Sequence, residues 1–146
     1  MGKKVRKNQV AYAFLNQIKK LDSLIENKLV EIDQLKSAAV DITARMGGER
    51  VKSSGTSTKM ADAVERYVDL EAEISRDIDR LVDAKKDVVA VIEQLHAQEY
   101  DVLHKIYVQY ISFYEVADIL KISYSAVTTA HGRALENVQH ILDGRK

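Results

Sequence analysis

Two long stretches of the chain carry apolar residues at alternating spacings of four and three, and this heptad pattern leaves few folds other than long paired helices. The first stretch is interrupted once, at Lys28, and runs through Phe14, Ile18, Leu21, Ile25, Ile32, Leu35, Ala39, Ile42 and Met46. The second is interrupted at Glu71 and Lys85 and runs through Met60, Val64, Tyr67, Ile74, Ile78, Leu81, Val88, Ile92 and Leu95. A helix over residues 8–46 would be about 58 Å long at 1.5 Å per residue, so it needs a partner to cover its apolar side.

The segment between the two stretches, residues 47–59, favours a reversal of the chain. It holds three glycines and five hydroxyl residues, which suit turns and helix caps better than helix interiors. We therefore expect residues 8–97 to form a long antiparallel helical hairpin with coiled-coil packing.

The reversal also predicts a register for the hairpin. Reflecting the chain about the loop brings Glu71 near Lys36 and Lys85 near Asp22, so that each interruption of the second seam would be paired. Apolar residues beside the seams would remain exposed, namely Leu24, Leu29, Leu70, Val82 and Val89. We expect a homodimer through the hairpin to cover them, the alternative being the C-terminal domain folded back over them.

The composition favours an all-α fold. Of the 146 residues, 46% are hydrophobic and 30% charged, as in folded proteins, and proline is absent. The chain has no cysteine, which excludes disulfides, thiolate metal ligands and cysteine nucleophiles. No apolar run approaches the roughly 20 residues of a membrane span, and the apolar piece after the basic start is too short for a signal peptide. We expect a cytoplasmic protein without a membrane partner.

Shorter helical periods follow in residues 98–146. A helix of about three turns is predicted first, with one face made of Tyr100, Leu103, Ile106, Tyr107 and Tyr110. Ser112 and Glu115 then form a capping-box pattern that opens a short helix ending near Lys121. Ser123 caps a longer helix, whose buried side is predicted to be Val127, Ala130, Ala134, Val138 and Ile141. Two short helices followed by a longer one are typical of a helix-turn-helix.

The opposite side of the last predicted helix is rich in hydroxyl groups. It shows Ser125, Thr128, Thr129, Gly132 and Glu136, with Tyr124 at the first turn. Hydroxyls bind base edges and phosphates, a threonine methyl fits against a thymine methyl, and a glycine lets a backbone come close. This chemistry permits binding to double-stranded DNA.

Residues 98–142 resemble region 4 of sigma-70-type factors. Residues 114–127, YEVADILKISYSAV, match that region's pattern E-E-I-A-E-x-L-G-I-S-x-x-x-V. The resemblance implies that Tyr124, Ser125, Thr128 and Thr129 face the bases and that Arg133 contacts the DNA backbone. Lys121 stands where the pattern has glycine, which predicts a strained or altered turn.

The layout of the whole chain is similar to that of phage-encoded transcriptional regulators of the ArpU type. The matching pieces are residues 21–28 (LDSLIENK), 48–55 (GERVKSSG), 77–83 (DIDRLVD) and 131–135 (HGRAL). The resemblance implies a phage or prophage regulator of transcription with a sigma-like DNA-binding end. We do not expect an enzyme.

The charge distribution predicts modest DNA affinity. Net charge is zero, and residues 98–146 hold five basic against six acidic residues, so we expect roughly 2 to 4 phosphate contacts per protomer. These contacts are expected from the basic residues Lys105, Lys121, Arg133, Arg145 and Lys146. The cap residue Ser123 is also predicted to lie at the DNA-binding site. A dimer on a repeated site, or tethering through RNA polymerase, would compensate by raising the effective concentration.

The first twenty residues differ from the rest because they hold six basic and no acidic residues. This basic start is either a solvated tail or an arm that touches a phosphate backbone. Three parts are therefore predicted: a basic tail at 1–7, the hairpin at 8–97 with its loop at 47–59, and the helix-turn-helix at 98–146.

Other functions fit the residues less well. Glu93 and His96 match half of a carboxylate-bridged metal site, but the second half is missing from the sequence. No catalytic motif, metal site or cofactor is predicted. Six aromatic residues have helical spacing that suits a core, with Tyr124 alone expected to reach DNA: Tyr100, Tyr107, Tyr110, Phe113, Tyr114 and Tyr124. The alternatives to a DNA-binding regulator are a protein-interaction module that keeps the helix-turn-helix fold and a packaging protein resembling a small terminase subunit.

Overall fold

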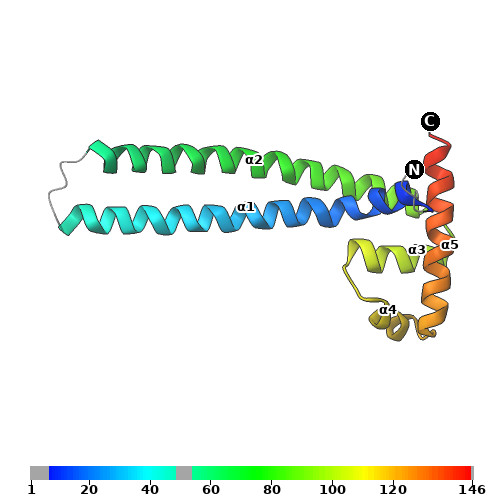
Figure 1. Cartoon of the computed structure of the whole chain (residues 1–146). Coiled ribbons are helices and arrows are strands. Elements are labelled where there is room, and N and C mark those ends of the chain that lie inside the picture. Colours follow the sequence, from blue (N-terminus) through cyan, green and yellow to red (C-terminus); the bar gives the residue numbers. More distant parts are fainter. Residues whose placement is uncertain (1–6, 49–53, 146) are drawn as a thin grey trace, which may run out of the picture. The chain divides into compact units, whose positions relative to one another are not determined.

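The computed structural model of the chain describes residues 7–48 and 54–145, without the side chains of residues 42, 43, 45–48 and 54–57. Every regular element of this described part is helical, so the all-α prediction is confirmed (Figure 1). The elements are α1 (Gln9–Gly48), α2 (Ser54–Ile92), α3 (Ala97–Leu103), the π-helix η1 (His104–Val108), α4 (Phe113–Leu120) and α5 (Tyr124–Asp143). No described helix is both long and apolar enough to cross a membrane.

Both long helices extend into the segment predicted as a loop. α1 continues to Gly48 and α2 begins at Ser54, so the non-helical connection is shorter than the predicted 47–59. Hydroxyl residues favour the first turn of a helix over its interior, which suits their place at the start of α2. Residues 49–53 of the predicted loop and residues 1–6 of the predicted tail lie outside the described residues.

The chain divides into two compact units, residues 21–80 and residues 1–20 with 81–146. In the first unit α1 and α2 lie side by side and run in opposite directions (Figure 1). Ile25 and Ile32 of α1 and Leu70 and Ile74 of α2 are buried. Apolar side chains at heptad spacing thus form the core of this unit.

A buried ion pair interrupts that core. Lys28, the gap in the first apolar seam, places its ammonium 2.5 Å from the carboxylate of Asp77 on α2. Asp77 is only 4% exposed. The hydrogen bond from Lys28 is the main cause that holds the pKa of Asp77 below its usual value. Nearby, Arg66 lies 3.0 Å from Glu31, so charged contacts join the two helices on more than one turn.

The second apolar seam was predicted correctly at Ile74, Val88 and Ile92, which are buried, but wrongly at two other residues. Val64 is 54% exposed and Ile78 is 45% exposed, whereas Leu70, which was expected beside the seam, is fully buried. Asp77 was passed over because a carboxylate usually marks a surface position. Its charge is compensated here by Lys28 and, at 3.4 Å, by Arg80, and the contact side of α2 runs through Leu70 and Asp77.

The register prediction also needs revision at Lys36. Its ammonium lies 5.7 Å from the centroid of the Tyr67 ring, one turn before the predicted partner Glu71. A cation over the face of an aromatic ring gains electrostatic energy without full desolvation.

The second unit combines the start of α1, the end of α2 and all the shorter helices. Its α1 part buries Ala11, Leu15 and Ile18, and its α2 part buries Val88, Val91 and Ile92. The shorter helices share a core of Val102, Val116, Ala117, Val127 and Ala130, against which Ile106, Ile111, Phe113, Leu120 and Ile122 pack. This core fixes the orientation of α4 and α5 relative to each other.

Candidate functional site

Helices α4 and α5 begin at serine caps, as predicted. The Ser112 hydroxyl accepts a hydrogen bond from the Glu115 backbone N–H at 3.2 Å, and the Ser123 hydroxyl accepts one from the Ala126 N–H at 3.0 Å. Each cap satisfies a backbone donor that the first turn of a helix leaves free. The two caps set the direction in which each helix leaves the turn.

The turn between α4 and α5 contains the predicted backbone strain. Lys121 has φ 56° and ψ 45°, the left-handed conformation. This conformation costs a side-chain-bearing residue about 1 kcal/mol relative to glycine. The Ile122 N–H donates to the Ala117 carbonyl at 3.1 Å, which closes the end of α4 and holds the turn in place.

One side of α5 is buried in the core described above. Val127, Ala130, Ala134 and Val138 are buried and Ile141 is half-buried, in agreement with the predicted apolar side. His131 and Leu135 are buried too, and the sequence pattern did not include them. The buried side is therefore wider than a single apolar stripe.

The other side of α5 is exposed and keeps its hydroxyl groups. Ser123, Tyr124, Ser125, Thr128 and Thr129 are all exposed. The Thr128 hydroxyl donates to the Tyr124 carbonyl at 2.9 Å and retains its oxygen lone pairs for another donor. This side of α5 is called the outer face below, and it comprises the exposed Ser125, Thr128, Thr129 and Gly132 and the half-buried Glu136.

Gly132 opens a gap in the outer face. A Cβ added at this position would meet no heavy atom within 4 Å. Glycine is costly in the middle of a helix, and no neighbouring group in the folded chain requires it here. The gap allows another backbone to approach α5 closely.

The predicted cations differ in accessibility. Lys121 and Arg133 are exposed, and Arg133 lines a cavity of about 430 Å³ together with His96 and Thr129. Lys105 comes from η1, its side chain is only 18% exposed, and its ammonium lies 3.7 Å from Asp101. The structure therefore brings Arg133 to the side of α5 that carries Thr129, and it leaves Lys105 the least accessible of the three.

Tyr114 is an exposed aromatic residue that the sequence interpretation wrongly assigned to the core. It is 71% exposed and stacks on Tyr124, with ring centroids 4.5 Å apart and an interplanar angle of 24°. Because α4 is only about two turns long, the spacing of its apolar residues is too short to show whether Tyr114 is buried. The stacked pair joins the start of α4 to the start of α5 and extends the exposed surface beyond the hydroxyl groups.

A buried polar pair supports α5 from the core side. The Tyr107 hydroxyl lies 2.7 Å from Nε2 of His131, and the Phe113 ring packs against the same imidazole at 4.9 Å. Burial lowers the pKa of His131 and raises the pKa of Tyr107. The neutral forms are therefore favoured, and the pair acts as packing that also satisfies its polar atoms.

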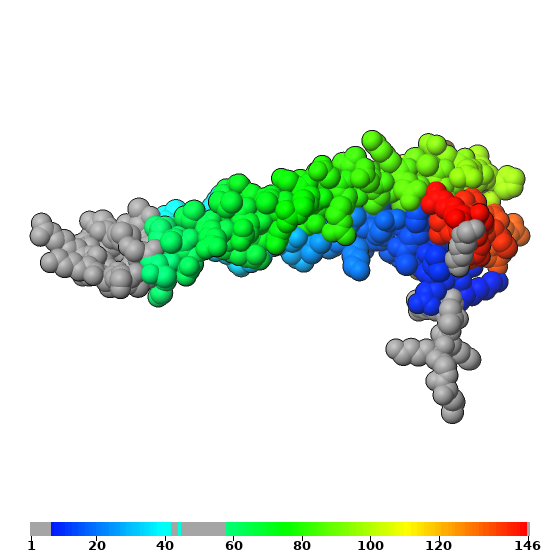
Figure 2. Space-filling model, turned by 90° about the horizontal axis from the view of Figure 1, so that it is seen from above, coloured from blue at the N-terminus to red at the C-terminus, as the bar shows by residue number. Residues whose placement is uncertain are grey.

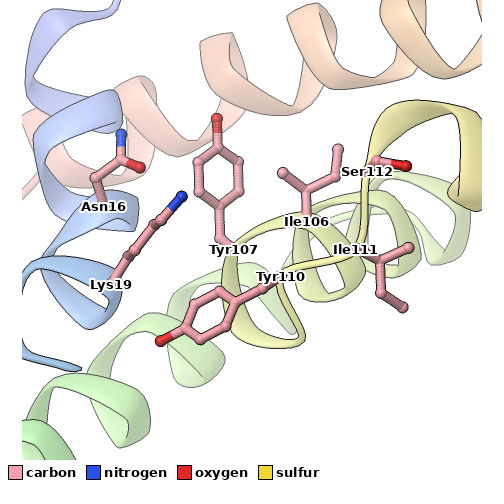
Figure 3. A pocket seen from close by; sticks show the side chains of 7 residues that line it. All are labelled: Asn16, Lys19, Ile106, Tyr107, Tyr110, Ile111 and Ser112. Carbon is pink, nitrogen blue, oxygen red and sulfur yellow. The ribbon is translucent and has the colours of Figure 1, made fainter. Parts of the chain in front are cut away.

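A separate cavity of about 270 Å³ lies between α1 and the connection from η1 to α4. Figure 3 shows Asn16 and Lys19 of α1 on one side of it and Tyr107, Tyr110 and Ser112 on the other. Tyr110 has φ 61°, at the point where the chain leaves the π-helix. The lining offers an ammonium, an amide and hydroxyls, without a carboxylate among its residues.

The described residues contain no group of three or more His, Cys, Asp or Glu side chains placed to hold a metal ion. Glu93 and His96 are both exposed. His104 Nδ1 lies 2.8 Å from the Gln109 amide nitrogen, while His131 belongs to the aromatic core. Comparisons with models of protein families, with curated proteins and with solved structures found no match for this chain.

Proposed function

We propose that the chain is a DNA-binding regulator of transcription in which α4 and α5 form a helix-turn-helix and the outer face of α5 enters the major groove. The observation that carries the proposal is that the core buries one side of α5 and leaves Ser125, Thr128 and Thr129 exposed on the other. A helix fits the major groove of a duplex, and hydroxyl side chains bind base edges and phosphates there. The sigma region 4 and ArpU resemblances support the same reading.

The turn geometry supports this proposal. A helix-turn-helix needs two helices held at a fixed angle by a short turn. Here Lys121, Ile122 and Ser123 make the whole connection between α4 and α5, and a shared core that includes Val116 and Val127 holds the two helices. The position of α5, the proposed recognition helix, is thus fixed by core packing and by helix caps rather than by a loop.

The few accessible cations favour a dimer on DNA. Lys121 and Arg133 are the exposed cations contributed by α5 and the turn before it, so one protomer neutralises few phosphates. Apolar side chains remain exposed on the helical pair of residues 21–80, including Leu24, Leu29 and Val68. We propose that this pair is the helical hairpin and that a second copy covers these residues, so that a dimer carries two α5 helices for two half-sites on DNA.

The proposal is tested by selecting fragments of genomic DNA with the full-length chain and measuring the affinity of a selected duplex for variants. Thr128→Glu places a carboxylate on the outer face, so it should weaken binding at least 100-fold. Thr128 is exposed and its hydroxyl bonds only to the Tyr124 carbonyl in the described contacts, so the melting temperature should change by less than about 2 °C.

A matched control changes the neighbouring buried residue. Val127→Asp places an unpaired charge in the core and should unfold the α4–α5 part of the chain, lowering both the melting temperature and DNA binding. Wild-type affinity in Thr128→Glu would show that the outer face of α5 does not contact DNA.

One observation favours a second function, a protein-interaction module. Tyr114 and Ile119 are both exposed on α4, and aromatic side chains are enriched at protein interfaces. Under this alternative, Tyr114→Ala would abolish capture of a protein partner such as RNA polymerase, and Thr128→Glu would leave that capture intact. Binding that is lost in Thr128→Glu and kept in Tyr114→Ala supports the DNA-binding regulator instead.

A further inference from the structure

The cavity between α1 and the connection from η1 to α4 has two walls from distant parts of the chain. Asn16 and Lys19 of α1 form one wall, and five residues between Ile106 and Ser112 form the other. Figure 3 shows the Lys19 side chain extending from α1 toward the side on which Tyr107 and Tyr110 lie. Polar and apolar groups thus surround one space of about 270 Å³.

The α1 wall of this cavity is fixed to the shorter helices by polar contacts with α5. The Lys7 ammonium lies 2.6 Å from the Glu136 carboxylate, and the Ala11 backbone N–H donates to the Gln139 side-chain carbonyl at 3.0 Å. Figure 2 shows the start of α1, in blue, directly beside the end of α5, in red. The start of α1 therefore holds the cavity open at a defined width.

The other wall is built from irregular backbone. In the π-helix η1 the Gln109 N–H donates to the His104 carbonyl at 3.0 Å, and the Ile111 N–H donates to the Lys105 carbonyl at 2.8 Å. Tyr110 has φ 61°, which is costly for a residue with a side chain. Such conformations and π-helical turns concentrate at ligand sites, where the surrounding structure maintains them.

The charge of the cavity comes from one lysine. Lys19 is exposed, and within residues 7–48 and 54–145 its ammonium makes no ion pair. The residues that line the cavity include no carboxylate and no second cation. One uncompensated ammonium suits a ligand group with a single negative charge.

Two neutral side chains add hydrogen-bond donors to this ammonium. The Asn16 amide nitrogen donates to the Tyr12 carbonyl at 2.9 Å, which uses one of its two hydrogens. The Ser112 hydroxyl accepts from the Glu115 N–H at 3.2 Å and keeps its own hydrogen for an acceptor. A carboxylate has two oxygens that accept hydrogen bonds from such donors.

The remaining lining is apolar. Ile106 and Ile111 are half-buried, and the Tyr107 ring is buried. Pockets for small molecules are mostly apolar with a few polar groups that fix orientation, and their volumes begin at about 300 Å³. A cavity of about 270 Å³ therefore fits a small ligand with an apolar body.

We propose that this cavity binds a small organic monocarboxylate, with the carboxylate held by Lys19, Asn16 and Ser112 and the apolar body lying against Ile106 and Ile111. The site is separate from the outer face of α5, and the proposal does not depend on DNA binding. Because Ser112 also caps α4, the ligand joins α1 to the start of that helix.

The test titrates the full-length chain, without DNA, with benzoate and with benzamide at constant ionic strength. Benzamide has the same ring as benzoate and no charge. Backbone amide chemical shifts of residues 106–112, measured by NMR, should move with benzoate at a Kd on the order of 1 mM. Benzamide should bind at least about tenfold more weakly, because it lacks the charge-assisted hydrogen bonds. Equal affinity for the two probes, or no benzoate-induced shift in this segment, would overturn the proposal.

Adjacent lysines provide a matched pair of variants. Lys19 lines the cavity and Lys20 does not, although both are exposed on α1. Lys19→Gln should weaken benzoate binding at least about tenfold and leave benzamide binding and the melting temperature unchanged. Lys20→Gln should bind benzoate as the wild type does. An equal loss in both variants would overturn the proposal, because it would show an effect of net charge and not of position.

A third variant tests the cavity by its volume. Asn16 is exposed, so Asn16→Trp should fold and fill the space from the α1 side. Binding of both probes should then be lost, whereas Lys19→Gln affects benzoate alone. Wild-type binding of benzoate to a folded Asn16→Trp chain would show that the ligand lies elsewhere and would overturn the proposal.

A phosphate monoester is the other small anion that this chemistry could attract. Phenyl phosphate carries up to two negative charges, and the cavity offers one ammonium. It should therefore bind no more tightly than benzoate. Phenyl phosphate binding at least about tenfold tighter than benzoate, with the same loss in Lys19→Gln, would overturn the assignment to a monocarboxylate.

Discussion

Replacing Gly132 by alanine separates the stability of α5 from its approach to DNA. Gly132 lies in the interior of α5 and a Cβ there meets nothing within 4 Å, so the change introduces no clash in the free protein. Alanine is favoured over glycine in a helix by about 0.5 to 1 kcal/mol. For a chain of this size we expect the melting temperature to rise by about 2 °C to 4 °C.

The same methyl group should weaken DNA binding. If the DNA backbone packs against the gap at Gly132, the added group overpacks the interface at a cost of about 1 to 3 kcal/mol. That cost corresponds to a loss of affinity of at least about fivefold. Thermal unfolding followed by circular dichroism and binding followed by fluorescence anisotropy measure the two effects on one preparation.

Gly144 provides the matched control. It caps α5 with an ordinary right-handed conformation, φ −68°, and an added Cβ meets backbone oxygens only at normal contact distances, the nearest at 3.5 Å. Gly144→Ala should therefore leave DNA affinity unchanged. The reasoning is refuted if Gly132→Ala is destabilised, or if it is stabilised and binds DNA as tightly as the wild type.

Three further changes test the supporting structure. Lys28→Met removes the closer ion-pair partner of the buried Asp77 carboxylate and leaves only Arg80 at 3.4 Å, so it should lower the melting temperature. Adding Asp77→Leu should restore most of the loss, since an apolar pair replaces a buried ion pair at little cost; additive losses would contradict this. Burial lowers the pKa of His131, so the unfolded chain binds a proton at this imidazole more readily, and the free energy of unfolding should fall as the pH drops from 7.5 through about 6.5 towards 5.5. In urea titrations, His131→Gln should flatten this pH profile. An unchanged profile would show that another group causes the pH dependence. Lys121→Gly should raise the free energy of unfolding by about 1 kcal/mol and weaken DNA binding. A destabilised variant would show that the turn does not carry the strain inferred from the Lys121 φ of 56°.

The parts of the fold that depend on local chemistry were predictable from the sequence. The caps at Ser112 and Ser123 follow from hydroxyl residues placed before apolar periods, and both form as expected. The apolar stripe of α5 follows from helical spacing alone, although His131 and Leu135 widen the buried side beyond it. The strained turn at Lys121 was predictable because the sigma pattern places glycine at that position.

The parts that depend on distant partners were not predictable. The closest ion-pair partner of the buried Asp77 is Lys28 on the other helix, and no local pattern marks such a carboxylate. Tyr114 lies on a helix that is too short for the spacing of its apolar residues to show which side is buried. The pairing of Lys7 with Glu136 joins residues 129 positions apart, and opposite charges alone give no reason to select that pair from the 22 basic and 22 acidic residues.

The most direct measurement of the central claim uses the absence of cysteine from the chain. Thr128→Cys and, separately, Ser75→Cys each introduce one thiol at an exposed position, and the rate of maleimide labelling is measured with and without a selected duplex. If the outer face of α5 enters the groove, the duplex should slow labelling at position 128 at least fivefold and leave position 75 unchanged. Unchanged labelling at position 128 in the DNA-bound protein would contradict the account.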